Sequence, residues 1–128
     1  MSNNKPNLIY VMCDELRQQA LGFMDKDPVY TPNLDAFAQE GLVLTDAVSN
    51  YPVCSPYRGM LFTGKYPFST GIVANCNSNT VRYGNYLKKN EICFSDILED
   101  IGYYNGYIGK WQCDVFLTEK VRHDCKVA

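Results

Sequence analysis

Cys54 and Arg58 are spaced to share one side of a helix, and their side chains suit chemistry on a tetrahedral anion. Pro56 fits the first turn of a helix, so Cys54 is expected just before the helix amino terminus. The helix dipole and the N–H groups there favour a negatively charged nucleophile, and the guanidinium of Arg58 can bind an oxyanion. The same spacing also fits a buried cysteine followed by a capped helix.

Asp14 and Glu15 are adjacent acids that directly follow an unbroken apolar run, residues 8–13. Such a run is typical of a strand buried on both faces of a parallel sheet, and the carboxyl ends of such strands are where open sheets place ligands. Carboxylate oxygens there can bind Ca²⁺ or Mg²⁺. A solvated turn is the alternative interpretation of the same two residues.

The next part of the chain predicts alternating helices and strands that would position these side chains. Thr31, followed by a proline, begins a helix that Gly41 ends, and residues 42–48 are a second β-rich run, which predicts a strand. A further helix is expected over residues 56–62. This order predicts an α/β fold with a mostly parallel sheet and flanking helices.

A long irregular segment, residues 63–90, is rich in glycine and asparagine. A loop of this length tends to lie beside a functional site. Ser95 is expected to cap a helix that Gly102 ends, and residues 103–108 are expected to form another strand. The polar residues after this strand would then lie at the ligand-bearing edge of the sheet.

The composition indicates one modest globular domain, with 128 residues, 46% hydrophobic and 20% charged, and a net charge of −2. Twelve basic and fourteen acidic residues give no electrostatic case for nucleic acid or a membrane surface, so a small-molecule partner is expected. The absence of a membrane-spanning apolar stretch and of a recognisable signal peptide favours a cytoplasmic location. Six cysteines without C-x-x-C spacing are expected to be mostly reduced thiols.

Three segments resemble the sulfatase family, and they occur in the family's order. The segment that begins at Cys54, CSPYRGMLFTG, is similar to the signature C-x-P-x-R followed by four residues and Thr-Gly. PNLIYVMCDELR and GYYNGYIGKW resemble the family's opening strand and its later G-Y-x-T-x-x-x-G-K-W-H segment. The resemblance implies an α/β fold of the alkaline-phosphatase type, a bound Ca²⁺, and a cysteine that a formylglycine-generating enzyme converts to formylglycine.

The resemblance also implies roles for individual residues. Cys54, oxidised to an aldehyde, would use one hydroxyl of its hydrate to attack the sulfur of a small-molecule sulfate ester. Asp14, Glu15 and the modified Cys54 would be metal ligands. Arg58 would steady the formylglycine and the metal site, and Lys110 would bind a sulfate oxygen and stabilise the charge that builds up during transfer.

Several positions depart from the family pattern. Glu15 occupies the place of a second aspartate, and Gln112 stands where the family has a histidine, so an amide replaces a titratable group. The resemblance ends near this point, which divides the chain into a sulfatase-like part, residues 1–111, and a divergent tail, residues 112–128. His123, the single histidine, is expected to be a solvated residue of that tail.

These departures leave three functional hypotheses open. In the first, the chain is the amino-terminal part of a sulfatase, truncated and weakly active or inactive, because the family's other metal ligands come later in its chain. In the second, it hydrolyses phosphate or phosphonate esters, since relatives with those substrates share the same opening strand and C-x-P-x-R signature. In the third, it is a non-catalytic fragment that binds an anion, or a partner through an exposed sheet edge.

Overall fold

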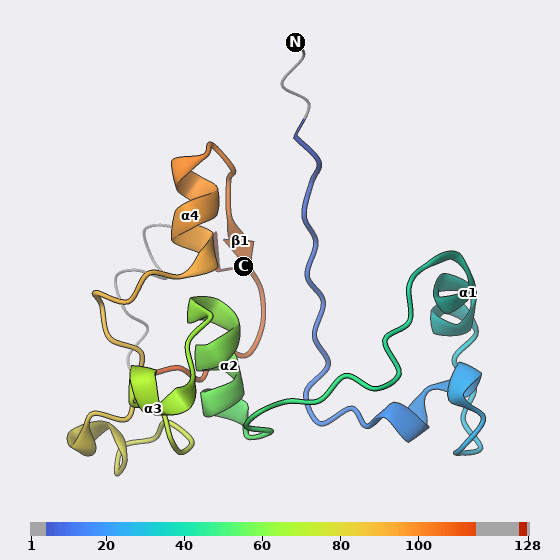
Figure 1. Ribbon diagram of the computed structural model, residues 1–128, viewed down its shortest axis with the longest axis horizontal. Coiled ribbons are helices and arrows are strands. Elements are labelled where there is room, and N and C mark those ends of the chain that lie inside the picture. The colour runs from blue at the N-terminus through green and yellow to red at the C-terminus, as the bar shows by residue number, and fades with distance from the viewer. Residues whose placement is uncertain (1–4, 115–125, 128) are drawn as a thin grey trace. The chain divides into compact units, whose positions relative to one another are not determined.

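The chain is described by a computed structural model over residues 5–114 and 126–127 (Figure 1). It divides into two compact units, Met1–Ala47 and Val48–Ala128. The expected metal ligands Asp14 and Glu15 belong to the first unit. The expected nucleophile and both of its cationic companions belong to the second unit.

In the first unit, the 3-10 helices η1 (Gln18–Ala20) and η2 (Gly22–Met24) precede the helix α1 (Pro32–Glu40). The predicted helix is confirmed, because α1 begins at the proline after Thr31 and ends before Gly41. The Thr31 hydroxyl donates to Asp35 at 2.7 Å and accepts from the Gly22 amide at 2.8 Å. Thr31 therefore joins η2 to the first turn of α1.

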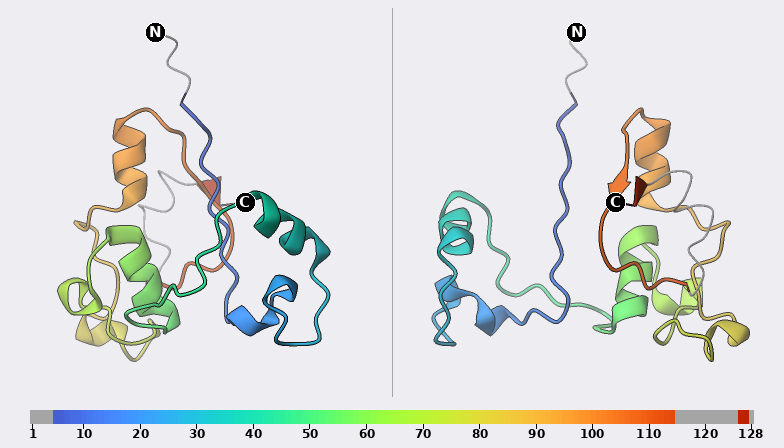
Figure 2. Two further views of the ribbon diagram at one scale, coloured as in Figure 1. Left: turned by 45° about the vertical axis from the view of Figure 1, so that its right-hand side comes forward. Right: turned by 180° about the vertical axis from the view of Figure 1, so that it is seen from behind.

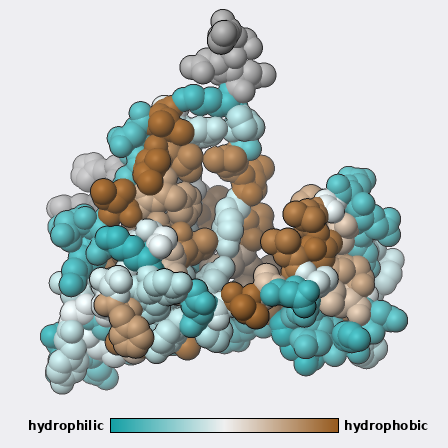
Figure 3. Space-filling model, viewed as in Figure 1, coloured by the Kyte–Doolittle hydropathy of each residue, from teal (hydrophilic) through white to brown (hydrophobic). Residues whose placement is uncertain are grey.

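The two predicted strands, the apolar run 8–13 and the β-rich run 42–48, which ends one residue beyond this unit, lie outside any strand, which corrects the prediction for both. Ile9 is 87% exposed and Leu42 is 87% exposed, and Figure 3 shows apolar side chains, in brown, on the surface. No residue within 5–47 is buried. A strand takes its backbone hydrogen bonds from neighbouring strands, and the described residues of this unit contain none to pair with.

The second unit packs short helices around one small core. Its elements in chain order are α2 (Cys54–Thr63), α3 (Pro67–Thr70), η3 (Val81–Tyr83), α4 (Phe94–Asp100), β1 (Gly106–Tyr107) and β2 (Lys126–Val127). α3 and α4 both contact α2, and Figure 2 shows α3 beside α2 in two further views. The buried apolar side chains are Phe62, Ile72, Cys76, Leu87, Cys93 and Cys113.

Aromatic rings extend this core to the residues that follow β1. The Phe62 ring stacks on Trp111 with their centroids 4.6 Å apart and on Phe94 with their centroids 6.0 Å apart. Tyr107 meets Trp111 edge-on, with their centroids 5.5 Å apart. The aromatic cluster joins α2, α4 and the segment after β1 into one packed unit.

Several predictions for the second unit need correction. α4 begins after Cys93, not Ser95, because the Cys93 amide donates to Asp96 at 2.7 Å in a capping box. The expected strand over 103–108 shortens to β1, which pairs in parallel with β2. In the part of the chain that the structure describes, this pairing is all that is seen of the expected mostly parallel sheet.

The irregular segment 63–90 forms structure of its own and is not only a loop. It contains α3 and η3, and it supplies Ile72, Cys76 and Leu87 to the core. The cysteines within the described residues are thiols and not disulfides, as expected. Among the described helices, none has the length and apolar character needed to cross a membrane.

Candidate active site

Cys54 is the first residue of α2, one position inside the helix rather than before it as expected. The helix starts early because Val53 is extended, with φ −127° and ψ 142°, and its carbonyl accepts from the Tyr57 amide at 2.9 Å. Pro56 is therefore the third helical residue, where a missing N–H still breaks no intrahelical bond. The sulfur of Cys54 lies in the first turn, where unbonded N–H groups favour an anion.

Lys110, which is distant from Cys54 in the sequence, contacts it in the fold. Its Nζ donates to the Cys54 Sγ at 3.6 Å across 56 residues of sequence. Lys110 follows β1 and the left-handed Gly109, whose φ is 114°. The structure thus brings together the expected nucleophile and the expected sulfate-binding lysine.

Arg58 is 4% exposed and directs its guanidinium to the backbone of the same segment. Its Nη1 donates to the Lys110 carbonyl and lies 3.5 Å from the Tyr107 hydroxyl. The Tyr107 hydroxyl also donates to the Lys110 carbonyl. Arg58 therefore ties the lysine-bearing segment to α2, one turn from Cys54.

Two polar residues that were not singled out from the sequence hold the start of α2. Ser55 is fully buried; its amide donates to the Asn75 Oδ1 at 3.1 Å, and its Oγ accepts from the Cys76 amide at 2.9 Å. The serine and asparagine are twenty residues apart, so no local pattern predicts the pairing. The only signal was the asparagine-rich composition of segment 63–90.

Asn85, also missed, is a buried amide that uses both ends of its side chain on the loop that contains Asn75. Its Oδ1 accepts from the amides of Val73 and Ala74 at 2.8 Å and 2.9 Å. Its Nδ2 donates to the Ala74 carbonyl at 2.8 Å and to the Cys76 sulfur at 3.7 Å. We name residues 73–76 the capping loop.

Two buried thiols, Cys76 and Cys113, belong to the core of the same unit. Burial raises the pKa of Cys113 well above its ordinary value, and neighbouring Cys76 raises it further. Burial also raises the pKa of Cys76, partly offset by a hydrogen bond from Ser55, and the charge of Asp114 adds to the increase. Both groups therefore remain neutral thiols at physiological pH.

The expected Ca²⁺ ligands do not form a complete site among the described residues. Asp14 and Glu15 are exposed, and Glu15 has a left-handed backbone with φ 58°. Within 5–114 and 126–127, no three His, Cys, Asp or Glu side chains come together as a metal site. Ca²⁺ takes six to eight oxygens, whereas two carboxylates supply at most about four. The described residues by themselves do not fit the ion.

The segment after Lys110 turns sharply into the core. Gln112 has φ 50°, and its buried Oε1 has no hydrogen-bond partner among the described residues. Cys113 follows as a fully buried residue, and its carbonyl accepts from the Leu87 amide at 2.7 Å. The first residues of the expected tail 112–128 therefore belong to the core, whereas His123 lies outside the described residues.

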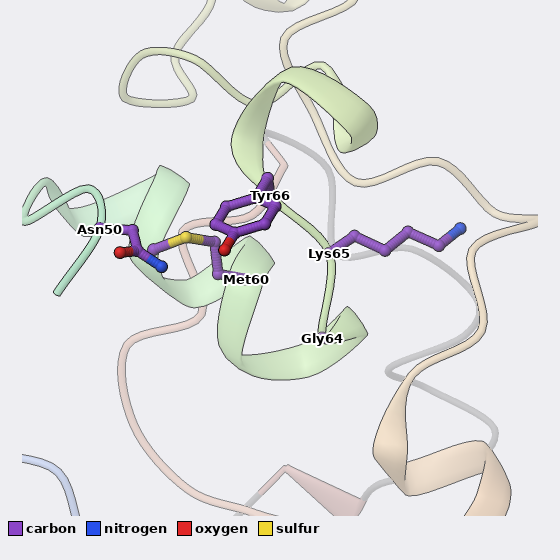
Figure 4. Close-up of a pocket in the computed structure, with 5 residues that line it drawn as sticks. All are labelled: Asn50, Met60, Gly64, Lys65 and Tyr66. Atoms are coloured by element: carbon purple, nitrogen blue, oxygen red, sulfur yellow. The ribbon is translucent and has the colours of Figure 1, made fainter.

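A shallow pocket lies elsewhere on the second unit (Figure 4). Asn50, Met60 and Tyr66 face one another across it, and Gly64 and Lys65 complete the lining. The Lys65 side chain points away from the pocket and pairs with Glu91 at 2.7 Å. Its lining therefore directs no charged group inward, unlike the site at Cys54.

Comparison with known proteins identifies the family. The Sulfatase family model matches residues 6–123, which is most of the chain. The segments that carry Cys54, Arg58 and Lys110 all fall within the match. The chain belongs to the sulfatase family.

Individual relatives agree with this assignment. The chain is 44% identical over 120 residues to the endo-4-O-sulfatase of Bacteroides thetaiotaomicron, covering 85% of the chain and 23% of that protein. It is 43% identical over 110 residues to the ulvan-active sulfatase of Formosa agariphila, covering 86% of the chain and 20% of that protein. The chain thus spans less than a quarter of the length of these relatives.

A solved structure shares the fold of the matched part. The protein yidJ of Bacteroides fragilis, assigned as a sulfatase, superposes with a TM-score of 0.83 at 52% identity. The match covers 85% of this chain and 23% of that protein. The chain therefore has the local fold of the corresponding part of an alkaline-phosphatase-like sulfatase.

Proposed function

We propose that the Cys54 site is part of the catalytic centre of a sulfuric ester hydrolase. The observation that supports it most directly is the 3.6 Å approach of the Lys110 Nζ to the Cys54 Sγ. An ammonium beside the nucleophile can neutralise a sulfate oxygen while the nucleophile attacks the sulfur. The family assignment favours sulfate over phosphate or phosphonate esters, because the matched relatives are named as sulfatases.

In this proposal Cys54 acts as formylglycine. A formylglycine-generating enzyme, with molecular oxygen as the oxidant, would convert its CH₂–SH group to an aldehyde as the C–S bond breaks and the sulfur leaves as sulfide, and water would add to form a hydrate with two hydroxyls. One hydroxyl oxygen bonds to the ester sulfur while the S–O bond to the alcohol breaks and the alcohol takes a proton. Loss of the proton from the second hydroxyl re-forms the C=O bond and expels sulfate, which regenerates the aldehyde.

The Ca²⁺ site expected at Asp14, Glu15 and the modified Cys54 stays a prediction, because the described residues by themselves do not fit the ion. The two carboxylates leave most of the coordination to other groups, and Glu15, with its extra methylene, is the less secure ligand. Calcium titration by calorimetry should therefore show weak binding to this chain. Tight binding would show that other residues complete the site.

Mass spectrometry of the peptide that contains Cys54 tests the proposed nucleophile. After co-expression with a formylglycine-generating enzyme, this peptide should carry an aldehyde, which a hydrazide reagent can trap. Cys76 and Cys113 in the same digest provide internal controls, because both should remain thiols. An unmodified Cys54 in a host that converts a known sulfatase would contradict the proposal.

Turnover of an aryl sulfate tests how far the described residues suffice. The 128-residue chain should show little or no hydrolysis, because its described residues supply only part of a metal site. The matched control is Cys54→Ala. Robust turnover that this substitution abolishes would contradict the expectation, and it would mean that other groups replace the missing ligands.

A further inference from the structure

We propose that Asn75 is a positioning residue for Cys54. The N-cap residue of α2 makes no side-chain hydrogen bond, and Asn75 of the capping loop supplies the missing acceptor instead. The inference rests on the proposed function only in treating Cys54 as the nucleophile. Its structural content concerns the unmodified thiol, so it can be tested without turnover.

The need for an external cap follows from the residue at the start of α2. Val53 occupies the N-cap position and makes no side-chain cap, because it has no polar side-chain atom. The first N–H groups of a helix have no intrahelical acceptor and must find one elsewhere. The Ser55 amide finds it in the Asn75 Oδ1, at 3.1 Å.

The contact is reciprocal, which distinguishes it from a single loop hydrogen bond. The Cys76 amide donates back to the Ser55 Oγ at 2.9 Å. Two hydrogen bonds in opposite directions thus join the first turn of α2 to residues 75 and 76, as a capping box joins the ends of one turn. Ser55 is fully buried, so its amide and hydroxyl have little access to water as a replacement partner, although Asn75 itself lies at the surface.

The capping loop is itself fixed, so it can hold the helix in place. Asn85 satisfies two of its amides and one of its carbonyls, and the Thr80 hydroxyl donates to the Asn75 carbonyl at 2.8 Å. Asn85 is almost fully buried. The capping loop, held by these hydrogen bonds, therefore offers Ser55 acceptors and donors at fixed positions.

Two separate attachments then determine where the sulfur and the ammonium meet. The capping loop fixes the backbone beside Cys54, and Arg58 fixes the backbone of Lys110. Loss of the cap should let the first turn of α2 fray, and the contact between Sγ and Nζ should loosen while the rest of the unit stays folded. Asn75 thereby acts on the nucleophile through Ser55.

The test compares Asn75→Leu, which removes the acceptor at similar size, with Asn75→Asp, which keeps it. Asn79→Leu is the matched control, because Asn79 is exposed as Asn75 is, but it is not the acceptor of the Ser55 amide. Hydrogen exchange at the Ser55 amide, followed by NMR, reports the cap. The yield of a short amine-to-thiol cross-link between Lys110 and Cys54, measured by mass spectrometry, reports the contact.

Asn75→Leu should accelerate Ser55 exchange by about two- to tenfold and lower the cross-link yield, since one hydrogen bond is lost. Asn75→Asp and Asn79→Leu should leave both readouts near those of the unaltered chain, and exchange at the core Leu87 amide should stay constant. Unchanged Ser55 exchange in Asn75→Leu overturns the proposal. If Asn75→Leu also accelerates exchange at Leu87, the whole unit is destabilised and the result for Asn75→Asp is decisive. Loss of protection at the Ser55 amide in Asn75→Asp also overturns the proposal. Failure of the sulfatase proposal would leave these readouts unchanged, because they involve only the thiol.

Discussion

At the residue scale, the two cations of the site have different tasks. Arg58 is buried and its Nη1 donates to the Lys110 carbonyl, whereas Lys110 directs its ammonium to Cys54. A planar guanidinium suits the first task because its several donors lie in a fixed geometry, and a single ammonium suits the second because it can follow a moving charge. Arg58 is thus a positioning residue, and under the proposed function Lys110 would supply the charge that meets the anion.

Asn85 should be among the most sensitive polar residues of the second unit. Asn85→Ala removes the acceptor of two backbone amides and the donor to the Ala74 carbonyl. We expect the free energy of unfolding in urea to fall by about 2–4 kcal/mol, because buried groups left without partners cost about 1–3 kcal/mol each. Asn79→Ala, at an exposed position, should change it by less than about 0.5 kcal/mol. Equal effects of the two substitutions would contradict the role given to Asn85.

The buried thiols predict instability at alkaline pH. Burial raises the pKa of Cys113 in the folded chain above its ordinary value of 9.0, so the folded state holds the proton that the unfolded state releases. The contribution of this thiol to the free energy of unfolding is therefore fully present below about pH 9. It falls as the pH rises further, by up to about 1.4 kcal/mol per pH unit for one thiol. Urea unfolding between neutral and alkaline pH measures the slope.

Cys113→Ala should reduce that alkaline slope. It should not abolish it, because burial raises the pKa of Cys76 in the same direction. The matched control is Cys13→Ala, at an exposed position of the other unit. An unchanged slope in Cys113→Ala would show that its thiol does not carry the effect.

At the element scale, α2 depends on close packing at a glycine. A Cβ placed on Gly59 would lie 2.8 Å from the Cδ1 of Ile72, which is fully buried. Glycine costs about 1 kcal/mol relative to alanine inside a helix, so this position gives up helix propensity for contact with the core. The contact brings the helix against the part of the chain that leads into the capping loop.

A double-mutant cycle tests this packing. Gly59→Ala alone should be neutral or destabilising, because the gain in helix propensity is offset by the clash with Ile72. Ile72→Val, which removes the Cδ1 atom, should cost about 0.5–1.5 kcal/mol by itself. In the Ile72→Val background, Gly59→Ala should stabilise by up to about 1 kcal/mol. Additive effects in urea unfolding would argue against the contact.

The elements that could be predicted from sequence are those whose signals are local. α1 matches the prediction because its proline and Gly41 both lie at its own ends. α2 begins earlier than predicted because the extended Val53 already accepts from the Tyr57 amide, and the Ser55 amide finds its acceptor in the distant Asn75, which no local pattern specifies. The apolar run 8–13 and the β-rich run 42–48 were predicted as strands from their own residues, but strand formation depends on partners that no local pattern specifies. Cys54 and Arg58 had a local signal, whereas Lys110 was found only through the family resemblance.

At the scale of the whole molecule, the two units differ in how much they bury. All buried side chains of the described chain belong to the second unit, and none lies within residues 5–47. A unit without buried apolar contacts has little free energy to oppose local unfolding of its backbone. The first unit should therefore be the less stable part of this chain.

Hydrogen exchange measured by mass spectrometry should show this difference directly. Peptides from residues 5–47 should exchange faster than those that contain Ile72, Leu87 or Cys113, because backbone opening there exposes almost no new apolar surface. The substitution Ile9→Asp should leave the melting temperature within about 1–2 °C of the unaltered chain, since the side chain is already exposed. Strong protection across residues 8–13 would contradict the expectation.

The stacking of Trp111 on Phe62 gives the site an optical signal. Trp111 is the only tryptophan of the chain, it directly follows Lys110, and its indole N–H is buried without a partner among the described residues. Indole fluorescence depends on the polarity of the surroundings, so all of the tryptophan emission of this protein originates beside the lysine that meets Cys54. Anion binding or loosening of that segment can therefore be followed without a label, in the same cuvette as the chemistry.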